Sequence, residues 1–196
     1  MALHLKNKYA LSWVIILMVF GVVSLANASD VKIKTIIDGL EHPWALAFLP
    51  DGRMLVTERP GRLRVVSQAG ALSKPIANLP AIHAKGQGGL LDVILDPEFV
   101  SNKRIYFSYS AKIGQKSATA VVRATLAGLT LDDVEVIFQQ SPALAGSHHY
   151  GSRLVIDKEG YLFITLGERG QRKKAQALDN HLGKGVRINR DGSVPQ

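Results

Sequence analysis

The chain has 196 residues, of which 46% are hydrophobic and 20% are charged, a balance that excludes general disorder. It contains no cysteine, which excludes a disulfide scaffold, a thiolate metal site and a cysteine nucleophile. The formal net charge is +8, but the basic residues are scattered without interleaved aromatic residues, and their one tight cluster is residues 172–174. We interpret this cluster as a solvated surface loop and expect no nucleic-acid partner.

The first 28 residues have the three parts of a secretory signal. Two lysines precede an almost unbroken apolar run over residues 9–25, and residues 26–28 are Ala-Asn-Ala, which a signal peptidase accepts. The alternative is a retained transmembrane anchor, because the run is at the lower limit of what spans a bilayer. We expect a cleaved signal over residues 1–28, a periplasmic or secreted chain that carries a charge of +6, and no stable membrane insertion after cleavage.

From residue 31 onward, apolar residues alternate as they do in strands, and turn signals separate the alternating runs. In Pro50-Asp51-Gly52, for example, proline fixes φ, aspartate caps the turn and glycine takes the positive φ. No segment has a helical stripe longer than a turn or two. The expected strands are residues 31–37, 44–49, 53–58, 62–66, 89–95, 104–110, 118–125, 134–138, 152–156 and 161–167.

Turn aspartates at positions 51, 96 and 157 mark a unit of two strands around a turn. It recurs about every 40–60 residues, which is typical of β-propeller blades. An antiparallel sandwich is the alternative, but the same turn chemistry in each unit favours the propeller. Residues 29–196 suffice for about three to four blades, whereas a closed ring has about four to eight. We therefore expect an all-β fold that is the N-terminal part of a larger propeller.

Polar residues directly before two of these strands are suited to bind a ligand at the mouth of a propeller channel. Gln87 lies in the glycine-rich loop at residues 86–89, where glycine lets the backbone approach a ligand; a plain turn is the alternative. His149 is suited to act as a general base, and a loop histidine bonded to backbone is the alternative. Adjacent side chains on an extended chain point in opposite directions, so we expect at most one of His148 and His149 to face the site, which makes a poor metal site.

A carboxylate follows the strand expected over residues 161–167. Glu168 at this position is suited to orient a histidine on the neighbouring strand by accepting its second N–H. The alternative is a surface ion pair with Arg169. A glutamine, a histidine and a glutamate at matching loop positions are together better evidence for a site than any one of them alone.

These residues fall within a longer series of motifs. Residues 39–52 are Gly-Leu-Glu-His-Pro-Trp-Ala-Leu-Ala-Phe-Leu-Pro-Asp-Gly, and residues 149–154 are His-Tyr-Gly-Ser-Arg-Leu. With these motifs the chain resembles the soluble aldose sugar dehydrogenases of the glucose/sorbosone dehydrogenase family, quinoproteins that use pyrroloquinoline quinone (PQQ). The further matches lie at residues 55–58, 87–93, 96–99, 102–107, 160–168, 175–176 and 183–184.

The resemblance implies a six-bladed propeller with the quinone over the channel mouth. It implies that His149 is the catalytic base, which takes a proton from the anomeric hydroxyl of an aldose while hydride passes from C1 to the quinone and a lactone forms. Glu168 would orient that histidine, and Gln87 would contact cofactor and substrate. Arg153, four residues after the histidine, is expected to bind cofactor or substrate. The expected partners are an aldose sugar and an unidentified electron acceptor, and a homodimer is left open.

Two residues and the length depart from the family pattern. Ser152 stands where the family usually has a second glycine, and Gly185 stands where an apolar strand residue is expected. Family members are longer than this chain, and their remaining half carries basic residues that hold the quinone together with the calcium ligands. We therefore expect calcium as a cofactor but no metal ligand within this chain, which alone is expected to be inactive. The alternative functions are a non-catalytic sugar-binding propeller and a calcium-dependent lactonase-type propeller.

Overall fold

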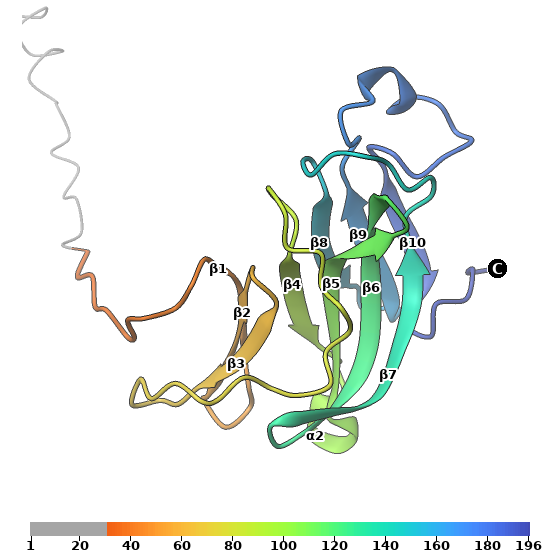
Figure 1. The fold of residues 1–196 in the computed structure, drawn as a ribbon. Helices are drawn as coiled ribbons and strands as arrows, with labels where there is room; N and C mark the ends of the chain where they lie inside the picture. The colour runs from red at the N-terminus through yellow and green to blue at the C-terminus, as the bar shows by residue number, and fades with distance from the viewer. Residues whose placement is uncertain (1–30) are drawn as a thin grey trace, which may run out of the picture. The chain divides into compact units, whose positions relative to one another are not determined.

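The computed structural model describes residues 31–196, and the signal sequence predicted over residues 1–28 lies outside them. The chain divides into one unit that ends at Lys34 and a second unit from Thr35 to Gln196, which contains all the described strands and helices. Within the described part of the second unit, ten strands pair antiparallel in three sheets (Figure 1). The all-β architecture predicted from the strand periodicity is therefore confirmed.

The three sheets follow one another along the chain, in the orders β1-β2-β3, β4-β5-β6-β7 and β10-β9-β8. The helices are short, and none among residues 31–196 is long and apolar enough to cross a membrane. The elements are β1 (Pro43–Phe48), β2 (Met54–Glu58), β3 (Arg62–Val66), β4 (Leu90–Leu95), α2 (Phe99–Asn102), β5 (Arg104–Ile113), β6 (Lys116–Ala127), β7 (Thr130–Gln139), β8 (Gly151–Ile156), β9 (Tyr161–Leu166), the 3-10 helix η1 (Arg172–Lys174) and β10 (Gly185–Asn189).

Strands β1 to β9 correspond to nine of the ten expected strands, and the strand predicted over residues 31–37 is wrong. Residues 31–40 have no regular secondary structure, and the side chains of Val31 and Ile33 are 83% and 93% exposed. An alternating pattern makes a strand only where another strand pairs with it and a core covers its apolar face. Here neither condition is met.

The turn aspartates act as their sequence context predicts. Asp51 accepts the backbone N–H of Arg53 at 3.0 Å, and Asp157 accepts that of Tyr161 at 2.8 Å. Asp96 accepts the N–H of Glu98 at 2.9 Å, at the start of the segment that carries α2. Each carboxylate therefore satisfies a backbone donor that the turn leaves unpaired.

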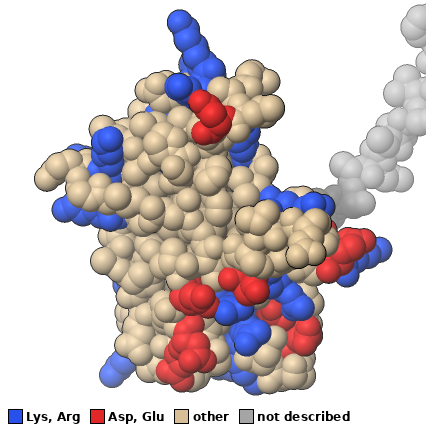
Figure 2. Space-filling view, turned by 90° about the vertical axis from the view of Figure 1, so that its right-hand side faces the viewer, with Lys and Arg blue, Asp and Glu red and all other residues tan. Residues whose placement is uncertain are grey.

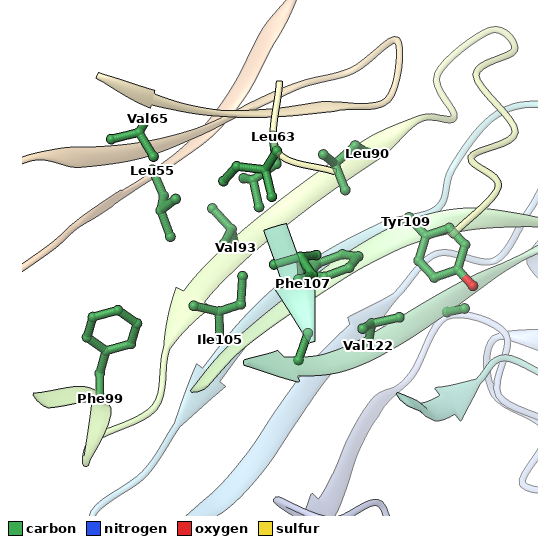
Figure 3. Packing of buried hydrophobic residues seen from close by; sticks show 14 of the residues in the cluster. Leu55, Leu63, Val65, Leu90, Val93, Phe99, Ile105, Phe107, Tyr109 and Val122 are labelled. Carbon is green, nitrogen blue, oxygen red and sulfur yellow. The ribbon is translucent and has the colours of Figure 1, made fainter. Parts of the chain in front are cut away.

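The middle sheet is covered on both faces, whereas the outer face of the first sheet is only partly covered and that of the third sheet is exposed. Side chains alternate along β5, so Phe107 enters a core with Leu55 of the first sheet, and Tyr106 enters a second core with Leu162 of the third sheet (Figure 3 shows the first core). On the outer faces, Phe48 of the first sheet is 70% exposed and Val155 of the third is 56% exposed. Three sheets stacked in series favour a propeller over a two-sheet sandwich.

An ion-pair cluster joins the third sheet to the second. Arg190, which follows β10, donates to the buried carboxylate of Asp96 at 3.0 Å and to Glu98 at 3.2 Å. Figure 2 shows acidic and basic side chains interleaved in the lower part of the face drawn there. The basic cluster at residues 172–174 forms η1, and all of its residues are exposed, as expected for a solvated segment.

The first strands of the three sheets lie close together, with β4 in contact with both β1 and β8. Strand β4 contacts β1 and β2 of the first sheet and β8 of the third. Strand β8 also pairs antiparallel with β9, with Gly151 opposite Leu166, so the chain before β8 and the chain after β9 emerge side by side. The loops before β4 and β8 and the segment after β9 therefore meet at one end of the sheets (Figure 1).

Candidate active site

The loops before β4 and β8 are bonded directly to each other. The backbone N–H of Gln87 donates to the carbonyl of Ser147 at 2.8 Å, and the backbone N–H of His149 donates to Oε1 of Gln87 at 2.8 Å. The amide oxygen of Gln87 is thus engaged within the protein, while its NH2 group remains available as a donor. The two loops thus bring together Gln87 and His149, the two candidate residues that the sequence places directly before strands.

His149 and Glu168 form a short polar contact beside these loops. Nδ1 of His149 lies 2.6 Å from Oε1 of Glu168, and this hydrogen bond lowers the pKa of the Glu168 carboxyl. Because an ionised carboxylate only accepts, the contact places a proton on Nδ1, so that in the neutral imidazole the Nε2 lone pair is free. The side chain of His149 is 45% exposed and that of Glu168 is 21% exposed, so the imidazole is open to a ligand.

Of the two adjacent histidines, His149 lines the cavity described below and His148 does not, as expected, but the premise of an extended chain at His149 is wrong. Its φ is +54°, and the two imidazole rings meet edge to face with their centroids 4.6 Å apart. The carbonyl of His149 lies where a Cβ of Gly167 would be, so only glycine fits at position 167. The left-handed backbone conformation at His149 therefore turns its side chain toward Glu168.

The alternative interpretation of Glu168, an ion pair with Arg169, is also wrong. Arg169 is 3% exposed and points away from the carboxylate, donating to backbone carbonyls of two other segments. Within the described chain, the side chain in ion-pair contact with Glu168 is His149.

Arg153 is held at the edge of this arrangement. Its Nη1 lies 2.9 Å from Oδ1 of Asp92, and its guanidinium stacks on the indole of Trp44, 4.5 Å from the ring centroid. Asp92 is 2% exposed and also accepts the backbone N–H of Leu154 at 2.7 Å; burial raises the pKa of its carboxyl. Arg153 therefore anchors β8 to β4 and contacts Trp44 of β1.

A cavity of about 490 Å³ lies between the loops, within the size range of small-molecule sites. Of the residues expected from the sequence, Gln87 and His149 line it, and Glu168 and Arg153 do not. The lining residues are Trp44, Arg59, Gly86, Gln87, Leu91, His149, Tyr150 and Gly151.

Trp44 and Arg59 are functional candidates that the sequence interpretation missed. Trp44 is the second residue of β1, the first strand of its sheet, whereas Gln87 and His149 lie in the loops before β4 and β8. Arg59 follows β2, and its Nη1 donates to the carbonyls of Gly86 and, at 3.3 Å, Gly88. Neither residue carries a local signal of a site, because a tryptophan within a strand fits a core position and an arginine after a strand fits a solvated turn.

Within residues 31–196, no group of three or more histidine or acidic side chains is arranged to hold a metal ion. The cavity presents a guanidinium, an amide and an imidazole, together with an indole. These groups are suited to a planar, acidic organic ligand and to proton transfer, because cations and N–H donors bind carboxylates and an imidazole accepts a proton.

Three comparisons place this chain among known proteins. A family model described as glucose/sorbosone dehydrogenase matches residues 40–196. Aldose sugar dehydrogenase YliI of Escherichia coli (strain K12) is 45% identical over 175 residues, which cover 87% of this chain and 47% of that protein. The chain thus spans about half the length of the curated relatives it matches.

Solved structures give the same result. The soluble aldose sugar dehydrogenase of Escherichia coli in its apo-form is 44% identical, with a TM-score of 0.81 over 84% of this chain and 49% of that one. The PQQ-bound aldose sugar dehydrogenase of Streptomyces coelicolor is 27% identical, with a TM-score of 0.72 over 82% of this chain and 48% of that one. The predicted propeller class is confirmed, with three blade-like sheets in the residues that the structure describes.

Proposed function

Since this chain belongs to the glucose/sorbosone dehydrogenase family, we propose that its protein oxidises the C1 hydroxyl of aldose sugars to lactones with PQQ as cofactor. The observation that carries the proposal is the 2.6 Å contact between Nδ1 of His149 and Oε1 of Glu168, beside a cavity that His149 lines. The names of the relatives, aldose sugar dehydrogenases, support the substrate class.

In this proposal His149 is the general base. With its Nδ1 proton held by Glu168, the Nε2 lone pair takes the proton of the anomeric hydroxyl. The imidazolium that forms is stabilised by the carboxylate of Glu168, and the C1–O bond becomes the carbonyl of the lactone. Glu168 thus orients the imidazole and stabilises its positive charge, and it stays ionised throughout the reaction.

The chemistry of the cavity suits the proposed cofactor, and its volume of about 490 Å³ is in the range of small-molecule sites. The Arg59 guanidinium and the free NH2 group of Gln87 would hold acidic or quinone oxygens, and the Trp44 indole offers a flat apolar face. When bound, PQQ supplies the two-electron acceptor that takes the hydride from C1. The guanidinium of Arg153, which stacks on the Trp44 indole, would hold that ring in place.

Further parts of the proposal concern features beyond residues 31–196. We propose that calcium is a second cofactor. Its ligands would come from the part of the fold that the relatives have and that this chain does not span. We also propose that residues 1–28 are a cleaved export signal, and that the protein acts in the periplasm or outside the cell.

The test is an assay of the full-length protein with PQQ, calcium, an aldose and an artificial electron acceptor. We expect PQQ-dependent lactone formation that falls at least about 100-fold in His149→Ala, since general-base catalysis contributes about 10²–10⁴-fold. His83→Ala is the matched control, because His83 lines a separate cleft. Sugar binding without oxidation would favour the non-catalytic alternative, and hydrolysis without quinone would favour the lactonase alternative.

A further inference from the structure

Arg169 is a buried cation that the proposed reaction does not use. Its side chain belongs to a residue that is 3% exposed, and among residues 31–196 no carboxylate lies within ion-pair distance of it. Burial lowers the pKa of the guanidinium. A buried charge without a counter-ion is retained only where hydrogen bonds replace its hydration, so the acceptors around Arg169 show what it holds.

Those acceptors lie on two segments. Nε of Arg169 donates to the carbonyl of His148 at 2.9 Å, and Nη2 donates to the carbonyl of Gly146 at 2.9 Å. Nη1 donates to the carbonyl of Ser117 at 2.9 Å, and Nη2 also donates to its hydroxyl at 3.0 Å. Both loop carbonyls belong to the segment immediately before His149, and Ser117 provides a fixed point on β6.

Tyr150 closes the other side of this arrangement. The guanidinium stacks on its ring, 3.9 Å from the centroid, and its hydroxyl lies 2.8 Å from the hydroxyl of Ser117. Its carbonyl accepts from Thr119 at 2.8 Å. The residues before and after His149 are therefore both tied to Arg169 or to its partners on β6, while the His149 side chain itself stays open to the cavity.

Arg169 also adjoins the second member of the proposed catalytic pair. Glu168 precedes it in sequence, so the anchor of the guanidinium limits where the Glu168 backbone can lie. The backbone at both His149 and Arg169 has a φ of +54°, a left-handed conformation that non-glycine residues adopt only where surrounding contacts hold them. The hydrogen bonds of Arg169 supply those contacts on both sides of the pair.

We propose that Arg169 is a positioning residue of the candidate active site, whose guanidinium holds the His148 and Gly146 carbonyls and so keeps Nδ1 of His149 on Glu168. The role in catalysis rests on the proposed function, but the effect on the hydrogen bond does not. Lysine cannot replace it, because an ammonium is a point donor on a flexible stem, and the four acceptors are spread around a planar fork.

The first measurement is the proton NMR signal of the His149 Nδ1–H in the full-length protein. A short hydrogen bond to a carboxylate gives a downfield resonance, which Glu168→Gln identifies by its loss. We expect the resonance to be lost in Arg169→Ala and Arg169→Lys, and restored in Arg169→Ala by millimolar guanidinium ion. Arg187→Ala is the matched control, because Arg187 also stacks on a tyrosine ring, at 4.8 Å from that of Tyr161, outside the candidate site.

A resonance that persists in a folded Arg169→Ala or Arg169→Lys protein would overturn the proposal. If Arg169→Ala does not fold, the lysine variant decides. In the PQQ-loaded protein we expect kcat to fall about 100-fold with little change in the KM for the sugar, since a small misplacement of a catalytic group has that effect. A raised KM with unchanged kcat would contradict a positioning role. Failure of the wild type to oxidise sugars would refute the proposed function and leave the NMR test of Arg169 standing.

Discussion

Ser152 offers a sharp test of how the backbone behind His149 is built. It lies in β8 with a φ of +94°, and it is fully buried. Its hydroxyl oxygen has no hydrogen-bond partner among residues 31–196, although its carbonyl accepts from Ser108 at 2.8 Å. Serine therefore stands at a position whose backbone suits glycine and whose surroundings do not suit a hydroxyl.

Two substitutions separate these effects. A non-glycine residue in this conformation costs about 1–3 kcal/mol, a buried unpaired hydroxyl costs about 1–3 kcal/mol, and glycine loses about 0.5–1 kcal/mol more in backbone entropy on folding. We expect Ser152→Gly to raise the free energy of unfolding by about 2 kcal/mol. Ser152→Ala removes only the hydroxyl and should raise it by about 1 kcal/mol.

Urea denaturation followed by circular dichroism measures both values in the full-length protein. The two variants should shift the midpoint upward in the order serine, alanine, glycine, with an unchanged m-value, which shows that the compactness of both states is unaltered. An alanine variant that is more stable than the glycine variant would refute the argument from backbone strain. A glycine variant less stable than wild type would refute both arguments together.

Three other predictions concern the catalytic pair, the pH dependence and the extent of the chain. Glu168→Gln should lower kcat in steady-state assays, with a smaller effect on KM, because the amide cannot stabilise the imidazolium of His149. An unchanged kcat would contradict this. Burial raises the pKa of Glu58, but hydrogen bonds, chiefly from Arg62, outweigh burial and lower it to about 2. Because this value lies below the ordinary 4.5, the stabilisation is complete above pH 4.5 and lost as the pH falls toward 2. Glu58→Gln should therefore destabilise by about 2 kcal/mol at pH 7, a difference that should vanish near pH 2 in urea titrations. Residues 29–196 expressed alone should not oxidise aldoses, and turnover by that fragment with PQQ would contradict this.

The strands were predictable because alternation and turn chemistry are local. The paired strands β1 to β9 correspond to runs whose apolar residues alternate, and the aspartates between them cap turns as expected. The run over residues 31–37 has the same local signal, but pairing and burial are decided elsewhere in the chain. Gly185 departs from the apolar residue expected there, yet β10 begins at this glycine and pairs it with Thr165 of β9, because strand pairing uses the backbone.

The candidate site was predictable in its residues more than in its geometry. Gln87, His149 and Glu168 were found by their positions next to strands, and the register of β8 and β9 explains why they meet. The orientation of His149 depends on a positive φ that its sequence does not announce. Nothing in the local sequence distinguishes Arg169 from an exposed arginine. It is buried because the tertiary structure surrounds its guanidinium with backbone carbonyls.

The most direct test of the account is the rate at which an aldose reduces bound PQQ in a single turnover. Wild-type protein and His149→Gln, each loaded with PQQ and calcium, would be mixed anaerobically with the sugar, and the quinone absorbance followed by stopped flow. We predict equal PQQ occupancy and a reduction rate at least about 100-fold slower in the variant, because it lacks the general base. Reduction at the wild-type rate by His149→Gln would contradict the central claim that His149, held by Glu168, takes the proton of the sugar.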